Sequence, residues 1–171
     1  MITITQAVTD ENIHEVRVLF AEYFDFLRTD VDTSVDDLDD VPPVAGYREE
    51  LARLPGKYGP PDGRLLLAAY EGETAGCAAF YKLSDGVCEV KRLWVRPKFR
   101  GKKISRMLVE TLIEDACKLG YLTMMLSTVD VLKEAISLYR SLGFETTAPY
   151  FDMPAAMLAH EIFMQLDLSG R

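Results

Sequence analysis

Residues 93–105 decide how this sequence is interpreted, and they read Leu93-Trp94-Val95-Arg96-Pro97-Lys98-Phe99-Arg100-Gly101-Lys102-Lys103-Ile104-Ser105. The first part has the apolar and aromatic character of a strand, and a basic, glycine-containing turn leads from it into an amphipathic helix. The first N–H groups of a helix have no partner inside the helix and carry partial positive charge, so they bind a diphosphate well when the backbone is accessible. Taken alone the stretch is a weak signal, because many helices begin with Lys and Arg.

The flanking segments predict how this turn sits in a sheet. Three strands joined by short turns are expected before it, and short turns imply an antiparallel meander. They cover Arg64 to Tyr70, Glu73 to Leu83 and Val87 to Val95. After Gly101 the apolar period becomes helical as far as Ala116, and a strand over residues 121–127 follows. A connection of this length predicts a right-handed parallel crossover.

The remaining segments complete an α+β fold. We expect a strand at residues 2–8, a helix that begins after the cap Thr9, helices at 45–54 and 131–142, and strands at 144–149 and 160–168 that pair antiparallel. The predicted architecture is a mixed, mostly antiparallel sheet of about seven strands with flanking helices and one parallel β-α-β crossover. Residues 1–171 are expected to form a single domain.

Composition narrows the classes of function. A net charge of −8 argues against binding nucleic acid, which needs a surplus of Lys and Arg. No apolar run reaches the roughly 20 residues that a bilayer requires, and no secretion signal is recognised, so no membrane partner and a cytoplasmic location are expected. Cys77, Cys88 and Cys117 are far apart and lack nearby histidines, which predicts reduced thiols and no metal.

The charges are unevenly distributed along the chain. Basic residues crowd the segment from Lys91 to Arg106, which suggests a local anionic ligand. Acidic residues crowd a second segment, where a solvated surface is the simpler interpretation. This acidic run contains Asp30, Asp32, Asp36, Asp37, Asp39 and Asp40.

Residues Arg100-Gly101-Lys102-Lys103-Ile104-Ser105 resemble the signature of the GCN5-related N-acetyltransferase (GNAT) family. That signature is Gln or Arg, two variable residues, Gly, one variable residue, and Gly or Ala. Here Lys103 stands where Gly is usual and Ser105 where Gly or Ala is usual. A side chain at Lys103 is expected to require a negative φ and to leave the diphosphate face. The helix ending in Leu142-Gly143-Phe144, with Tyr139 inside it, also matches the family, although Leu132 replaces an Asn that is often present.

The resemblance implies acetyl-coenzyme A (acetyl-CoA) as the co-substrate and assigns roles to particular residues. Glu89 is the expected general base, and Tyr139 is the expected acid that protonates the departing thiolate. In the family the strand splays, so that free backbone amides bind the pantetheine and polarise the acyl carbonyl. The expected cofactor-binding residues are Leu93, Trp94, Val95, Arg100, Gly101, Lys102, Lys103, Ile104 and Ser105.

Each of these assignments has a purely structural alternative. Glu89 fits an exposed strand glutamate paired with a lysine, and Tyr139 fits a core aromatic residue. Simple alternation places Trp94 on the strand face away from Glu89, in the core. The other candidates are weaker: Tyr23, Phe24 and Tyr150 for an acceptor pocket, His14 and His160 as surface histidines, and the three cysteines as packing residues.

The leading hypothesis is direct transfer of acetyl from acetyl-CoA to a primary amine, carried by a small molecule or a protein. An acidic surface favours cationic acceptors. The alternative is a non-catalytic module that binds or senses acyl-CoA. A dinucleotide-binding unit is excluded because there is no GxGxxG and antiparallel strands precede the turn. Edge strands near residues 150–160 suggest a possible homodimer.

Overall fold

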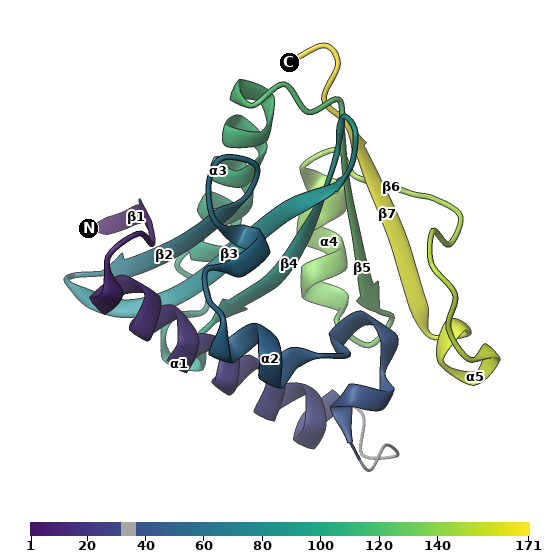
Figure 1. Cartoon of the computed structure of the whole chain (residues 1–171), viewed down its shortest axis with the longest axis horizontal. Coiled ribbons are helices and arrows are strands. Elements are labelled where there is room, and N and C mark those ends of the chain that lie inside the picture. Colours follow the sequence, from purple (N-terminus) through teal and green to yellow (C-terminus); the bar gives the residue numbers. More distant parts are fainter. Residues whose placement is uncertain (32–36) are drawn as a thin grey trace.

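The chain folds around one seven-stranded sheet with the strand order β1-β2-β3-β4-β5-β7-β6 (Figure 1). A computed structural model describes residues 1–31 and 37–171; Asp32 and Asp36 of the acidic run lie outside the described residues. The strands are β1 (Ile2–Gln6), β2 (Arg64–Tyr70), β3 (Glu73–Ser84), β4 (Val87–Val95), β5 (Thr123–Val129), β6 (Glu145–Thr146) and β7 (Glu161–Asp167).

Helices cover both faces of this sheet (Figure 1). On one face the buried stripe of α1, which contains Val16, Leu19 and Phe20, packs on β2 and β3. On the other face α3 buries Leu108 and Leu112 against the same strands. The helices are α1 (Asp10–Phe26), α2 (Tyr47–Ala52), α3 (Ile104–Lys118), α4 (Lys133–Ser141) and the short α5 (Ala155–Leu158).

The topology confirms the predicted fold class. Strands β2, β3 and β4 form the antiparallel meander, and the crossover through α3 makes β4 and β5 parallel. The last two strands pair antiparallel as predicted, with β7 lying between β5 and β6. The predicted strand at 144–149 was too long: β6 ends at Thr146, and only one further backbone bond, from Thr147 to Phe163, follows.

Strands β4 and β5 separate after a short paired segment. Their pairing ends with Glu89 opposite Met125, and Figure 1 shows the two strands diverging towards their C-terminal ends. From residue 90 onward the β5 side of β4 therefore has no strand partner. The backbone N–H and C=O groups along that edge are available to a ligand. Because buried backbone groups need partners, a ligand is expected to bind there.

A β-bulge in β4 changes which side chains share a face. Cys77 is opposite Trp94 and Ala79 is opposite Lys91, so Ala78 alone faces two residues of β4. Arg92, at the bulge, has a left-handed φ of 62°. The extra residue shifts the alternation of side chains between the two faces of β4 by one position. Trp94 therefore lies in the buried cluster between α1 and the sheet, on the same face as Glu89. The prediction that Trp94 lies on the opposite face was wrong, because simple alternation ignores the bulge.

Candidate active site

The turn before α3 presents backbone donors without competing groups. Gly101 and Lys103 have φ values of 79° and 65°, and Lys103 is the N-cap residue. Among the described residues, no acceptor bonds the backbone N–H groups of residues 101–106, and the first turn of α3 has no acidic side chain. Aligned free donors at a helix start make an anion-binding site.

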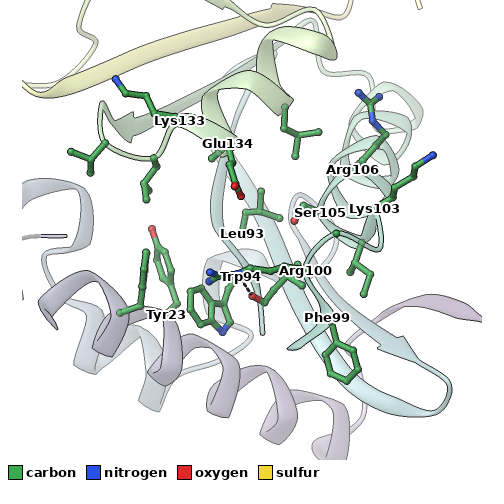
Figure 2. Close-up of a pocket in the computed structure, with 18 residues that line it drawn as sticks. Tyr23, Leu93, Trp94, Phe99, Arg100, Lys103, Ser105, Arg106, Lys133 and Glu134 are labelled. Carbon is green, nitrogen blue, oxygen red and sulfur yellow. Dashed lines mark hydrogen bonds between the residues drawn. The ribbon is translucent and has the colours of Figure 1, made fainter. Parts of the chain in front are cut away.

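Lys103, at the position where the GNAT signature has Gly, adopts a left-handed backbone conformation, which glycine takes more easily than other residues. The expectation of a negative φ was wrong; the residue takes φ 65° and ψ 13°. Its side chain does point away from the centre of the cavity, as expected (Figure 2). A left-handed conformation costs a non-glycine residue about 1–2 kcal/mol. The turn therefore keeps its shape at a cost in stability.

The basic side chains near this turn bind mainly to protein partners. Lys102 lies 4.5 Å above the Tyr70 ring, and Arg106 contacts Glu110 and Ser141. Arg100 stacks 5.2 Å from the Trp94 ring. The positive charge that this turn offers to an anion therefore comes more from the backbone amides than from the charged groups of these side chains.

A groove of about 760 Å³ runs from this turn to the start of α4. Its lining contains every predicted cofactor residue except Lys102. Figure 2 shows Tyr23 and Glu134 directed into the groove from α1 and α4, with Leu93 next to Glu134 in this view. The groove follows the edge of β4 that β5 leaves unpaired.

A second, smaller cavity of about 140 Å³ adjoins the groove. We call it the inner pocket. The groove and the inner pocket share the lining residues Tyr23, Leu93, Leu132 and Ala135. Most of its wall is apolar, and its aliphatic side chains include those of Leu27, Val31, Leu38, Val41, Val44, Leu126 and Val129. A ligand in the groove can therefore meet a second ligand at the shared wall.

Glu89 is buried and bonded to three donors. Its carboxylate accepts from the hydroxyls of Tyr81, at 2.6 Å, and Tyr150, and it pairs with Lys91 at 3.2 Å. Only 2% of the residue is exposed, and it lines neither cavity. Its position confirms a face opposite to Cys88 and Val90, which lie in the cluster below α3. Its role as a base stays a prediction.

Tyr139 lies in the wall of the inner pocket on α4. It packs edge-to-face on Phe144 at 5.6 Å, and only 6% of the residue is exposed. Burial raises its pKa well above the ordinary value, so the phenol is protonated at neutral pH. The burial agrees with the packing interpretation, and the role of Tyr139 as an acid stays a prediction. Tyr139 and Tyr23 both line the inner pocket, and Tyr23 also belongs to the wall shared with the groove.

The structure brings forward a carboxylate that the sequence analysis missed. Glu161, the first residue of β7, lines the inner pocket. Burial raises its pKa to about 7, opposed by the nearby Ser127 hydroxyl and the Lys91 ammonium. No ordinary hydrogen bond joins Ser127 Oγ to it, and Ser127 Oγ is a buried oxygen without a partner among the described residues. Sequence offered no signal for Glu161, because only the β5–β7 pairing carries it to the pocket.

The other candidates from the sequence are placed as follows. Tyr23 lines both cavities, Phe24 is a buried core residue, and Tyr150 bonds Glu89 outside the lining. His160 is exposed and lies 3.0 Å from Asp130. Burial raises the pKa of the Cys88 thiol to about 12, which leaves it unreactive.

Two kinds of site do not occur among residues 1–31 and 37–171. No cluster of three or more His, Cys, Asp or Glu side chains there is arranged to bind a metal ion. No helix in the same residues has the length and apolar character needed to span a membrane.

Comparison with known proteins identifies the family. Residues 27–144 match the Acetyltransferase (GNAT) family. An uncharacterized N-acetyltransferase of Schizosaccharomyces pombe is 37% identical over 170 residues, covering 98% of this chain and 96% of that protein. The chain belongs to the GNAT family of acetyltransferases. The predicted membership and the predicted acyltransferase activity are confirmed.

Solved GNAT structures agree with the fold. An acetyltransferase of the GNAT family from Staphylococcus aureus superposes with a TM-score of 0.74 at 18% identity, covering 98% of this chain and 99% of that one. YncA of Salmonella typhimurium, solved with its cofactor acetyl-CoA, gives a TM-score of 0.66 at 21% identity, covering 99% and 95%. The overall fold of this GNAT chain thus has solved counterparts.

Proposed function

We propose that this GNAT acetyltransferase binds acetyl-CoA in the groove and transfers the acetyl group directly to a primary amine held in the inner pocket. The observation that carries the proposal is the meeting of the two cavities at Tyr23, Leu93, Leu132 and Ala135, beside the open edge of β4. A thioester at this wall faces the cavity from which an amine can attack. Direct attack needs both substrates bound together.

The diphosphate of acetyl-CoA is proposed to bind the amides of residues 101–106. These donors are unbonded, and no carboxylate in the first turn of α3 competes for them. Ser105 adds a hydroxyl at the groove wall. The groove lining at this turn also includes Arg100, Gly101, Lys103 and Ile104, so their predicted contacts with acetyl-CoA are part of the same proposal. Lys102, stacked on Tyr70, contributes through its backbone.

The open edge of β4 is proposed to bind the pantetheine arm and the acyl oxygen. Residues Leu93, Trp94 and Val95 line the groove where β4 has no partner on its β5 side. Backbone N–H groups fixed by the sheet stabilise the oxyanion that forms when the amine nitrogen attacks the carbonyl carbon. The C–N bond forms, the C–S bond then breaks, and CoA leaves as its thiolate.

Tyr139 is proposed to give its proton to the departing thiolate. Burial raises the pKa of a thiol as it does that of a phenol, so the two groups remain matched in the same apolar surroundings. Glu89 is the base predicted from the sequence. Glu89 is bonded to three donors, one of which is Lys91, and this favours a role in holding Lys91 in position. The variant Glu89→Gln is therefore compared below with a variant of a carboxylate that lines the pocket.

Calorimetry with acetyl-CoA, followed by a thiol-release assay over a panel of amines, tests the proposal. Tight binding with amine-dependent release is expected. Binding without release by any amine would favour the acyl-CoA-sensing alternative, which family membership does not favour. Four statements stay predictions: the identity of the acceptor, the single domain, the homodimer and the cytoplasmic location. Analytical sedimentation tests the homodimer.

A further inference from the structure

We infer that the acceptor is a compact primary amine with an uncharged, apolar body, and that Glu161 binds its ammonium group and removes the proton. The inference rests on the proposed function, since it concerns the second substrate of the same reaction. It depends on the charges of the inner pocket, its walls and its size.

The polar end of the inner pocket has one carboxylate without a basic partner among the described residues. Lys91 pairs with Glu89 at 3.2 Å, and Arg92 pairs with Glu50 at 2.8 Å. Glu161 lines the same pocket and has no ion pair within the described chain. Glu161 is partly buried, and a carboxylate withdrawn from water without a counter-ion is costly, so a cationic ligand relieves that cost. An ammonium ion is the matching ligand.

Ser127 supports the same placement of the ammonium group. Ser127 and Glu161 lie on one face of the sheet, because Glu161 is directly opposite Val129 and Ser127 is two residues away on β5. Ser127 Oγ is buried and lacks a hydrogen-bond partner in the described chain. A primary ammonium has three donors, so it can bond the carboxylate and the hydroxyl together.

The rest of the pocket fits carbon better than charge. Aliphatic side chains from three segments form its wall: Leu27 and Val31, Val41 and Val44, and Leu126 and Leu132. Its volume of about 140 Å³ is close to the ~150 Å³ apolar cavity in another protein that binds benzene. An acceptor of this size has a body of roughly five or six carbon atoms. A second charge on that body would be buried without a partner.

The proton step balances without another reactant. The Glu161 carboxylate takes one proton from the ammonium ion and becomes a neutral carboxyl group. The amine that results has the free electron pair that forms the C–N bond with the acetyl carbon. As the C–S bond breaks, this nitrogen loses a second proton, which replaces the proton that Tyr139 gives to the thiolate. The proton then leaves Glu161 for solvent after the amide product departs, which restores the carboxylate.

The pH dependence follows from the groups that face Glu161. Burial raises its pKa most, Ser127 and Lys91 oppose this, and Asp130 and Glu89 add to it. The phenols of Tyr23 and Tyr150 also lie within electrostatic range of the carboxylate. Because the base is the deprotonated form, kcat/KM is expected to fall tenfold per pH unit below about pH 7.

Three amines with similar bodies test the substrate class. Isoamylamine has an apolar five-carbon body, leucine adds a carboxylate, and cadaverine carries a second ammonium group. The enzyme with saturating acetyl-CoA is expected to use isoamylamine with a kcat/KM about 100-fold above the other two, because each extra charge is desolvated in the pocket. Preference for leucine, cadaverine or a tripeptide amine would overturn the inference and leave the proposed function intact.

Variants and binding measurements distinguish the role of Glu161 from the binding of acetyl-CoA. Glu161→Gln is expected to lower kcat/KM about 100-fold and to abolish the acid limb near pH 7, with unchanged affinity for acetyl-CoA. Glu145→Gln, on the exposed β6, is the matched control. An acid limb that persists in Glu161→Gln but disappears in Glu89→Gln would overturn the role of Glu161 and support Glu89.

A filling variant tests the pocket itself. Val129→Phe is expected to raise KM for isoamylamine at least tenfold without changing acetyl-CoA affinity, and Val18→Phe, on the exposed side of α1, is expected to change neither. Calorimetry of isoamylamine with the enzyme–CoA complex gives a readout that does not need turnover. Binding without turnover would overturn the proposed function, whereas turnover unaffected by Val129→Phe would overturn the pocket assignment.

Discussion

The groove and the inner pocket adjoin each other but are built in different ways. The groove is lined mainly by two continuous stretches, residues 93–106 and 131–138. The inner pocket is assembled from α1, the segment 38–44, β4, β5, α4 and the start of β7. Local sequence therefore determines the groove, whereas tertiary packing determines the pocket.

The two regions also differ in how they carry charge. The groove offers backbone amides at the start of α3, whose positions depend on the turn and not on side-chain identity. The wall of the pocket includes Lys91 and Arg92, which pair with carboxylates behind the wall; Arg92 joins Glu50 at 2.8 Å. Changes of side chain should therefore affect the pocket strongly and the groove only where they alter the backbone or add charge.

Breaking the pair below the pocket is expected to have the largest effect. In Arg92→Met the mostly buried Glu50 carboxylate loses its nearest cation and keeps only the Tyr58 hydroxyl and the Lys57 ammonium at 4.0 Å, which costs about 3–5 kcal/mol and lowers Tm by about 10 °C. Calorimetric or circular-dichroism melting measures this. Arg96→Met is the control, because the Arg96–Glu22 pair is more exposed and should cost about 1 kcal/mol or less. Equal losses in both variants would show that burial of the pair does not matter.

Adding a carboxylate at the start of α3 is expected to separate binding from stability. Ser105→Asp puts negative charge beside the diphosphate site and should weaken acetyl-CoA binding about 100-fold, or ~2.7 kcal/mol. The same charge interacts favourably with the helix dipole, so Tm should stay level or rise. Ser105→Asn is the uncharged control. Unchanged affinity in Ser105→Asp would place the diphosphate elsewhere.

Removing one phenol is expected to affect turnover alone. Tyr139→Phe should lower kcat about 30-fold while leaving the affinity for acetyl-CoA unchanged, because the ring still packs on Phe144. Pre-steady-state thiol release checks that the chemical step is the slow one. A parallel loss of cofactor affinity would mean that Tyr139 acts through the shape of α4.

A smaller effect concerns the turn itself. Lys103→Gly should relieve the left-handed strain and raise Tm by about 2 °C, since the gain of 1–2 kcal/mol is partly offset by chain entropy. Gly101→Ala should lower Tm, because Gly101 has a φ of 79° and no atom within 4 Å of an added Cβ, which leaves backbone strain as the cause. Equal shifts of the same sign would contradict this account of the turn.

Burial of Glu161 also gives a pH dependence of stability. Its pKa is raised to about 7 from 4.5, so its stabilising contribution is complete below pH 4.5 and is lost as pH rises through 7. Glu161→Gln should therefore melt a few degrees higher than the native protein at pH 8, with the difference shrinking towards pH 5. A difference that grows at low pH would contradict the raised pKa.

These contrasts explain what the sequence could predict. The meander, the crossover and the basic turn follow from local periodicity, and so does the lining of the groove around Gly101. The face of Trp94 and the φ of Lys103 did not, because a bulge and a strained cap depend on packing across β3 and around the turn. Glu161 had no local signal, since its partners lie on β4 and β5.

The central claim is that two cavities hold two substrates, with the diphosphate on the amides of residues 101–106. Amide NMR spectra recorded during sequential addition of acetyl-CoA and then isoamylamine test it most directly. Acetyl-CoA is expected to move the signals of residues 101–106, and the amine is expected to move those near Val129 and Glu161. If acetyl-CoA binds without moving the signals of residues 101–106, or if both ligands move the same residues, the account is contradicted.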